Sequence, residues 1–175
     1  MTMIQSVARD HVKQAARGHH PSLGALLQAM VDGDFVPTRH VRITDAATYT
    51  VLAQDSGVPH IIPELAASIT ITLPTPKDGL SFEFFGKGVA VEAQGWIFTT
   101  GSDTNFFNGS ITHADTDAGA GADELVPVYP DGNSNSKLTL ATPHANSRVR
   151  FISDGTLWTV EGIGFSVTAP AFADQ

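Results

Sequence analysis

The sequence from Thr48 to Phe85, TYTVLAQDSGVPHIIPELAASITITLPTPKDGLSFEFF, contains the pattern that decides the fold class. Within it, Ile69–Leu73 (ITITL) alternates apolar and hydroxyl side chains, as expected for a strand with one buried face. A proline-rich segment ending at Asp78-Gly79 then interrupts the alternation and turns the chain. The alternation resumes at Leu80–Phe84 (LSFEF). The stretch therefore predicts a hairpin-like unit of two strands joined by a turn.

A second unit of this kind lies near the C-terminus. The segments Ser147–Ile152 (SRVRFI) and Thr156–Val160 (TLWTV) flank Ser153-Asp154-Gly155. Asp-Gly between two alternating segments is a strong hairpin signal, and a type I′ turn there requires positive φ at both central residues. Two such units, with shorter strand-like segments between them, predict one antiparallel β body.

The remaining segments complete a mainly β fold class. About nine to eleven short strands are expected at the spacing of roughly 8–12 residues that is typical of sandwiches and barrels. We therefore predict an antiparallel β-sandwich or jelly-roll-like barrel over residues 41–175. The expected core contains the inward-facing apolar residues of both units and the two tryptophans: Ile69, Leu73, Phe82, Phe84, Trp96, Phe151 and Trp158.

Residues 1–40 differ in pattern and predict a helical N-terminal arm. Met3–Arg17 has apolar residues at helical spacing and is followed by Gly18 and Pro21, which favour a helix end. Ser22–Val31 predicts a second short helix with a stronger apolar face. The arm either docks on a partner or folds back on its own β body. For docking, the expected contact residues are Ile4, Val7, Val12, Arg17, Leu23, Leu26 and Leu27.

Composition excludes several classes of function. The 175-residue chain has net charge −8 and only 16% charged residues. Up to Arg42 it carries five basic and three acidic side chains, and after Arg42 five basic and fifteen acidic ones. A body this acidic argues against a nucleic-acid partner, since phosphate contacts need clustered Lys or Arg. No apolar segment approaches the length of a membrane span, the N-terminus lacks the apolar segment of a signal peptide, and the chain has no cysteine.

No set of residues predicts catalysis or a cofactor. His113, Asp115 and Asp117 alternate as metal ligands on one strand face would, but a solvated loop over Thr112–Glu124 is the simpler interpretation. Asp131–Asn135 resembles the start of a calcium loop but lacks its glycine and terminal glutamate, which favours an ordinary turn. The glutamates have no assigned partners: Glu64, Glu83, Glu92, Glu124 and Glu161. We therefore expect no catalytic, cofactor-binding or metal-binding residue.

The two units also carry a resemblance to a known class of protein. The motif Thr72-Leu73-Pro74-x-Pro76, then Gly79 and Phe82-x-Phe84, follows an Asp55-Ser56-Gly57 turn. The late segment RVRFISDGTLW, residues 148–158, has the same character. Together these motifs resemble the β-domain of virion proteins from tailed bacteriophages, over residues 41–165.

This resemblance implies a function. Proteins with such modules include capsid decoration, or cement, proteins, which bind the outside of the head and stabilise it. It implies the major capsid protein as partner, a homotrimer as the favoured assembly, and a place on the virion exterior after assembly in the host cytoplasm. The alternative is a tail-fibre or tail-adaptor module that binds a host glycan or another virion protein.

Overall fold

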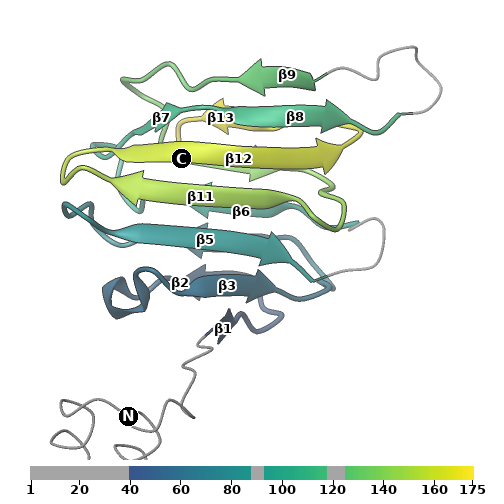
Figure 1. Cartoon of the computed structure of the whole chain (residues 1–175), viewed down its shortest axis with the longest axis horizontal. Coiled ribbons are helices and arrows are strands. Elements are labelled where there is room, and N and C mark those ends of the chain that lie inside the picture. The colour runs from purple at the N-terminus through teal and green to yellow at the C-terminus, as the bar shows by residue number, and fades with distance from the viewer. Residues whose placement is uncertain (1–39, 88–92, 118–124) are drawn as a thin grey trace, which may run out of the picture. The chain divides into compact units, whose positions relative to one another are not determined.

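The computed structural model describes residues 40–87, 93–117 and 125–175 (Figure 1). The predicted arm helices and the seven expected contact residues lie outside the described residues. The larger sheet contains β1 (Val41–Arg42), β3 (Pro59–Ile62), β5 (Ser81–Gly86), β7 (Phe107–Gly109), β8 (Ile111–Asp115), β9 (Leu125–Val128), β11 (Arg148–Ser153) and β12 (Trp158–Ser166). The smaller sheet contains β2 (Thr48–Thr50), β4 (Ile69–Thr72), β6 (Trp96–Thr99), β10 (Lys137–Leu140) and β13 (Ala171–Ala173). One short 3-10 helix, η1, covers Ala53–Asp55.

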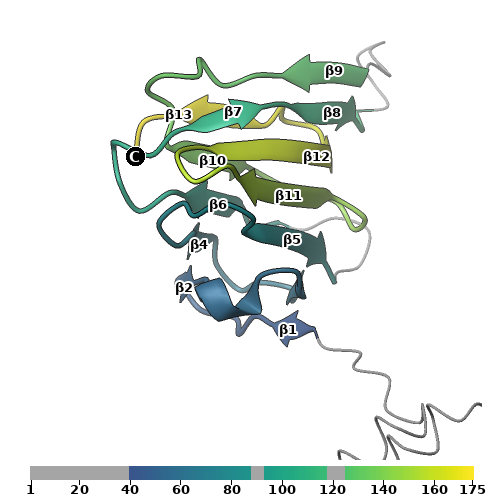
Figure 2. The same ribbon diagram turned by 60° about the vertical axis from the view of Figure 1, so that its left-hand side comes forward.

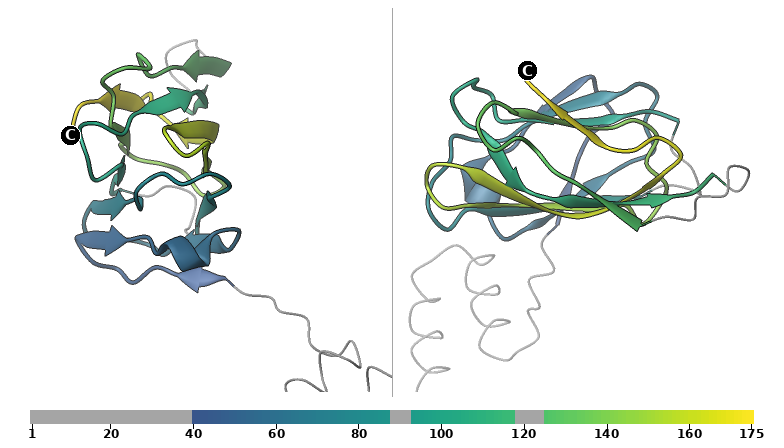
Figure 3. Two further views of the ribbon diagram at one scale, coloured as in Figure 1. Left: turned by 90° about the vertical axis from the view of Figure 1, so that its left-hand side faces the viewer. Right: turned by 90° about the horizontal axis from the view of Figure 1, so that it is seen from above.

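The fold is mainly β, as predicted, and its two sheets lie as two layers (Figures 2 and 3). The larger sheet has the order β1-β3-β5-β11-β12-β8-β9, with β7 also paired to β12. The smaller sheet has the order β13-β10-β6-β4-β2. Strands β5, β11 and β12 therefore occupy the middle of the larger sheet, so both sequence units contribute to its centre.

The prediction that the sheets are antiparallel is wrong, because both are mixed. From β1 to β6 the chain changes sheet after every strand, so each strand pairs in parallel with the next strand but one. His60 in β3, for example, pairs with Val41 in β1 and with Phe84 in β5. In the smaller sheet, β2, β4 and β6 are parallel in the same way. Crossing to the opposite layer and back returns the chain in its original direction, which produces parallel neighbours.

The first unit is consequently not a hairpin. Its strands β4 and β5 belong to opposite sheets, and the proline-rich segment between them connects the two layers. Both strands bury their alternate apolar residues in the same core, which explains why they share one sequence pattern. Leu73, at the end of β4, donates its N–H to the Thr99 carbonyl of β6 rather than to β5.

The second unit is an antiparallel hairpin, as predicted, with Phe151 opposite Val160. Its turn differs from the expected type I′. The strands end at the Ser153–Trp158 pair, and of the residues between them only Gly155 has positive φ, at 96°. Asp154 shapes the turn instead, since its Oδ1 accepts N–H bonds from Thr156 and Leu157, both at 2.8 Å.

One hydrophobic core fills the space between the sheets, and all seven predicted core residues belong to it. Phe98 of the smaller sheet has its ring centroid 5.0 Å from those of both Phe84 and Phe151 of the larger sheet. Burying one such aromatic side chain stabilises the fold by about 1.5–3 kcal/mol. Aromatic contacts across the layers therefore make a large contribution to holding the two sheets together.

The structure differs locally from the sequence analysis in two further places. Thr112–Asp115 belongs to strand β8 rather than to an exposed loop, while 118–124 lies outside the described residues. Phe165 and Ser166 form the end of the long strand β12. A strand within the C-terminal Pro/Ala segment, β13, was not predicted. Within the described part of the chain, no helix has the length and apolarity to cross a membrane.

Candidate functional site

A row of charged side chains crosses the outer face of the larger sheet, the face turned away from the core. Glu83, Arg150 and Glu161 occupy directly paired positions on β5, β11 and β12. Arg150 donates from Nη1 to Glu161 at 2.9 Å and from Nε to the Ser81 hydroxyl at 3.3 Å. Strand alternation makes this row possible, because residues two apart on a strand share a face.

Arg148 is the next outward-facing residue to Arg150 on β11, and it completes the charged row. Its Nε is 3.6 Å from Glu83, and its guanidinium carbon is 5.9 Å from the centroid of the Phe85 ring. These ion pairs are largely exposed, with about half of each arginine side chain accessible. Exposed pairs contribute only about 0.2–1 kcal/mol each. Their importance therefore lies in the pattern they present to a partner rather than in stability.

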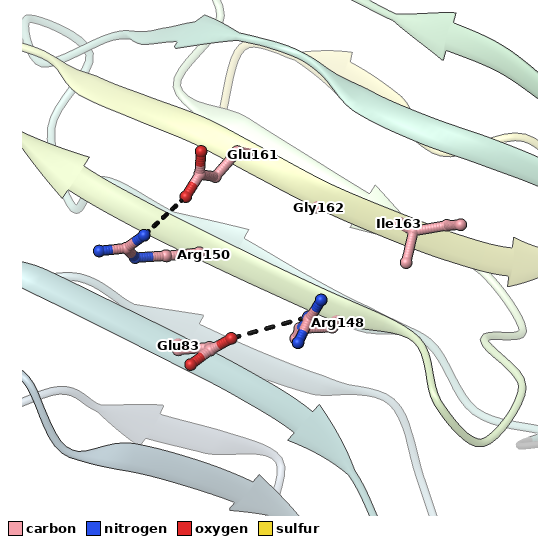
Figure 4. Close-up of a pocket in the computed structure, with 6 residues that line it drawn as sticks. All are labelled: Glu83, Arg148, Arg150, Glu161, Gly162 and Ile163. Carbon is pink, nitrogen blue, oxygen red and sulfur yellow. Dashed lines mark hydrogen bonds and ion pairs between the residues drawn. The ribbon is translucent and has the colours of Figure 1, made fainter.

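The charged row lines two neighbouring hollows. The larger, of about 480 Å³, lies over β5, β11 and β12 and is lined by Glu83, Arg148, Arg150, Glu161, Gly162 and Ile163 (Figure 4). A smaller hollow of about 140 Å³ shares Glu83 and Arg150 with it and continues to residues 57–59 beside β3. The outer face is therefore recessed along its charged row.

An apolar stripe runs beside the charged row. Its residues lie at outward-facing positions of β9, β12, β5 and β3, with β8 between β9 and β12 and with Arg148 of β11 between Ile163 and Phe85. They are exposed or half-buried: Leu125, Pro127, Phe165, Ile163, Phe85 and Ile61. Leu125 is 70% exposed. Exposed apolar groups that gather on one face and are bordered by polar ones are typical of protein interaction surfaces.

The β9 edge extends this apolar character. Val126 is 41% exposed and Tyr129, directly after the strand, is 65% exposed. Among the described strands, β9 pairs only with β8, so its other side is a sheet edge. Pro127 removes one backbone donor from this strand, a feature that protects edges against adding further strands. The geometry therefore favours docking through side chains over extension of the sheet.

A third hollow, of about 280 Å³, lies near the end of β12. Thr116, His144, Asn146 and Phe165 are among its lining residues, and the Thr116 hydroxyl is 3.2 Å from Nε2 of His144. Asn146 has φ of 75°, and it is the only non-glycine residue with positive φ in the described chain. Asparagine tolerates this conformation better than most residues, so a tight turn is a sufficient explanation.

The metal-capable residues do not converge. His113 points toward the core, and its Nε2 lies 2.9 Å from the Ser166 carbonyl oxygen. Asp115 instead accepts the N–H of Asp117. Across the ranges that the structure describes, no three metal-binding side chains form a group. Asp131 accepts N–H bonds from Asn133, Ser134 and Asn135, which confirms the predicted turn at this loop.

Sequence reasoning missed the outer face. The seven expected contact residues are all in the arm, outside the described residues, so that prediction stays untested. Glu83 and Glu161 were recognised only as isolated carboxylates. A signal was available in Arg148 and Arg150, since they are two of the five basic residues after Arg42 and lie two apart on a predicted strand.

Comparison with known proteins gives no relative from which residue roles could be transferred, because no protein-family model and no curated protein matches the chain.

Proposed function

We propose that this protein is a bacteriophage capsid decoration protein that binds the outer capsid surface through the outer face of its larger sheet. The observation that carries the proposal is the apolar stripe beside the charged row, a patterned surface that no other described element covers. The resemblance of the two sequence units to phage virion β-domains supplies the partner class, the major capsid protein.

The architecture suits this role. We infer that the body is a β-sandwich, because both sheets bury their inner faces in one core and leave the outer faces available. Paired strands hold the backbone beneath the stripe residues at fixed spacings, so docking costs little backbone conformational entropy. A specific interface of standard size buries roughly 800 Å² on each partner. The outer face spans seven paired strands.

The proposed mechanism is stabilisation by binding, without catalysis, cofactor or metal. A protein that bridges neighbouring capsid subunits stabilises the assembled lattice over its separated parts, by mass action. A homotrimer at a local three-fold position would multiply the contacts. In this proposal the arm residues Ile4, Val7, Val12, Arg17, Leu23, Leu26 and Leu27 add a second contact with the capsid.

The test compares the thermal rupture temperature of capsids that lack this protein with the same capsids after its addition. The native chain should raise the rupture temperature, and Leu125→Asp or Ile163→Asp should remove most of that increase. Leu52→Asp is the matched control, because Leu52 is 51% exposed but lies outside the stripe.

Two results would contradict the proposal. Equal rupture temperatures with and without the native chain would exclude a cement role. Detection of the protein on tails by antibody labelling of virions would instead support the tail-adaptor alternative.

A further inference from the structure

His60 lies in the core and has an unusual environment for a titratable residue. It is completely buried in β3, with its ring 4.9 Å from the Phe84 ring and 5.9 Å from the Phe82 ring, centroid to centroid. Tyr49 of β2 contacts it from the opposite sheet, at 6.2 Å. The imidazole is thus enclosed by three aromatic rings from both layers.

Neither ring nitrogen of His60 has a well-formed hydrogen bond to any described residue. A neutral imidazole has one donor and one acceptor, and leaving such groups unpaired in a core carries a free-energy cost. Two other core side chains, Trp96 and Trp158, also have an unpaired ring nitrogen. Only His60 among these three can take up a proton near neutral pH.

The groups around the ring only partly compensate for a positive charge. The backbone of Val58, which is near the ring but does not meet hydrogen-bond geometry, and the carboxyl group of Asp55 in η1 favour the protonated form. Tyr49 adds a phenol whose own pKa is raised by burial. The other two neighbours named above, Phe82 and Phe84 on β5, carry no titratable group. Burial is the dominant influence and lowers the pKa of His60 below 6.5.

His60 also lies at the less supported end of the larger sheet. Its strand pairs with β5 on one side and with β1 on the other, and β1 contributes only two paired residues, Val41 and Arg42. β1 is the edge strand, and only His40 separates it from residues 1–39 in the sequence. Edges with few pairings open at lower free energy than the centre of a sheet.

We propose that His60 is an acid-sensitive switch, whose protonation opens the β1–β3 end of the larger sheet while the remaining strands stay paired. When β3 separates from β5, the imidazolium reaches water and its charge is solvated. The proton comes from solvent, and no covalent bond changes. The switch acts on the strand that joins residues 1–39 to the β body, and it does not depend on the proposed capsid binding.

The sign of the effect follows from linkage. Because the folded-state pKa of His60 lies below 6.5, the opened state binds the proton more tightly. The closed state is fully favoured above pH 6.5 and loses stability as the pH falls from 6.5 toward the folded-state pKa. One linked proton changes the opening equilibrium by up to about tenfold per pH unit within that window.

Hydrogen exchange of the full-length protein at pH 7.5, 6.0 and 5.0 tests the switch. The amides of Ile43 and Lys87 donate to the β3 carbonyls of Ile61 and Ile62, and the amide of Leu73 in the smaller sheet is the internal reference. After correction for intrinsic exchange rates, protection at Ile43 and Lys87 should fall by up to about tenfold per pH unit below 6.5. Protection at Leu73 should stay constant.

Two variants and a titration complete the experiment. His60→Leu should remove the acid-dependent loss, whereas His113→Gln should retain it, because His113 is buried but has the Ser166 carbonyl beside Nε2. If His60→Leu does not fold, the NMR titration of the native imidazole decides. A midpoint below 6.5 that coincides with lost protection supports the switch. Constant protection at Ile43 and Lys87, or titration of His60 without loss of protection, would overturn it.

Discussion

At the residue scale, the close approach of the neighbouring strand β11 requires a glycine at position 162. A Cβ at this position would overlap the carbonyl oxygen of Arg148, and both are backbone positions in paired central strands. Gly162→Ala should therefore destabilise the protein by roughly 1–3 kcal/mol, as overpacking does in ordered interiors. Urea unfolding measures this free energy.

The matched control for that substitution is Thr159→Ala, on the outer face of the same strand. Removing a half-buried outer side chain should cost less than about 1 kcal/mol. Equal effects of the two substitutions would show that β12 can shift away from β11 to accept the extra carbon.

Asp131 provides a second prediction at this scale, on pH dependence. Hydrogen bonds from the Ser134 hydroxyl and from the backbone of Asn133, Ser134 and Asn135 lower the pKa of Asp131 from 3.8 to about 2. Stability from this carboxylate is fully present above pH 3.8 and is lost as the pH falls toward 2. The unfolding free energy of Asp131→Asn should thus decrease less than that of the native chain between pH 5 and 2.

The control for the pH experiment is Asp103→Asn, at another exposed loop position. The unfolding free energy of this variant should change with pH in the same way as that of the native chain. An Asp131→Asn curve that parallels the native curve would mean that the turn keeps its hydrogen bonds in the unfolded chain or does not form them in solution.

At the element scale, the β11–β12 turn depends on Gly155. This residue has φ of 96°, and an added Cβ would lie 3.4 Å from the backbone nitrogen of Asp78 in the proline-rich segment. Gly155→Val should therefore destabilise the protein by roughly 1–3 kcal/mol, the cost of forcing a β-branched residue into a sparsely populated backbone region. Thr156→Val, an exposed position in the same turn, is the control. A melting temperature that is unchanged by Gly155→Val would show that the turn adopts another conformation.

Strand pairing is the level at which sequence-based prediction failed. Period-two alternation identifies which residues face a core, so Phe82, Phe84 and Phe151 were predicted correctly. It does not say in which sheet a strand lies, because β4 and β5 face the same core from opposite sides. The proline-rich segment between them was compatible both with a turn and with a crossing between layers. Parallel pairing follows only if the segment crosses between the layers.

The candidate site shows a similar limit at the level of elements. The pattern RVRF predicts that Arg148 and Arg150 share the outer face of a strand. Their partners Glu83 and Glu161 come from two other strands, and their alignment depends on the register of β5 and β12 against β11. Register is set by tertiary packing and turn length, so the charged row could not be predicted from one strand.

At the scale of the whole molecule, the outer face differs in charge from the rest of the body. After Arg42 the chain carries ten more acidic than basic side chains. On the outer face of the central strands β5, β11 and β12, two arginines form ion pairs with two glutamates, and Arg42, paired with Ile61 at the β1 edge, adds a further positive charge. A sheet centre whose charges are internally compensated does not repel an acidic partner and has few unpaired charges to desolvate.

This compensation leads to a prediction about the salt dependence of capsid binding. If the apolar stripe supplies most of the affinity, raising the ionic strength should weaken binding only slightly. Dissolved salt screens interactions between exposed charges but does not weaken apolar contacts in this way. Binding of the full-length protein to capsids, measured by co-sedimentation at about 0.05 M and about 0.5 M salt, should change by less than about threefold. Arg150→Gln removes the ion-pair partner of Glu161, while Glu83 keeps Arg148. If the capsid surface is acidic, binding of this variant should be weaker at low salt and recover at high salt. A strong loss of native binding at high salt would show instead that charge pairs between protein and capsid, and not the stripe, hold the complex together.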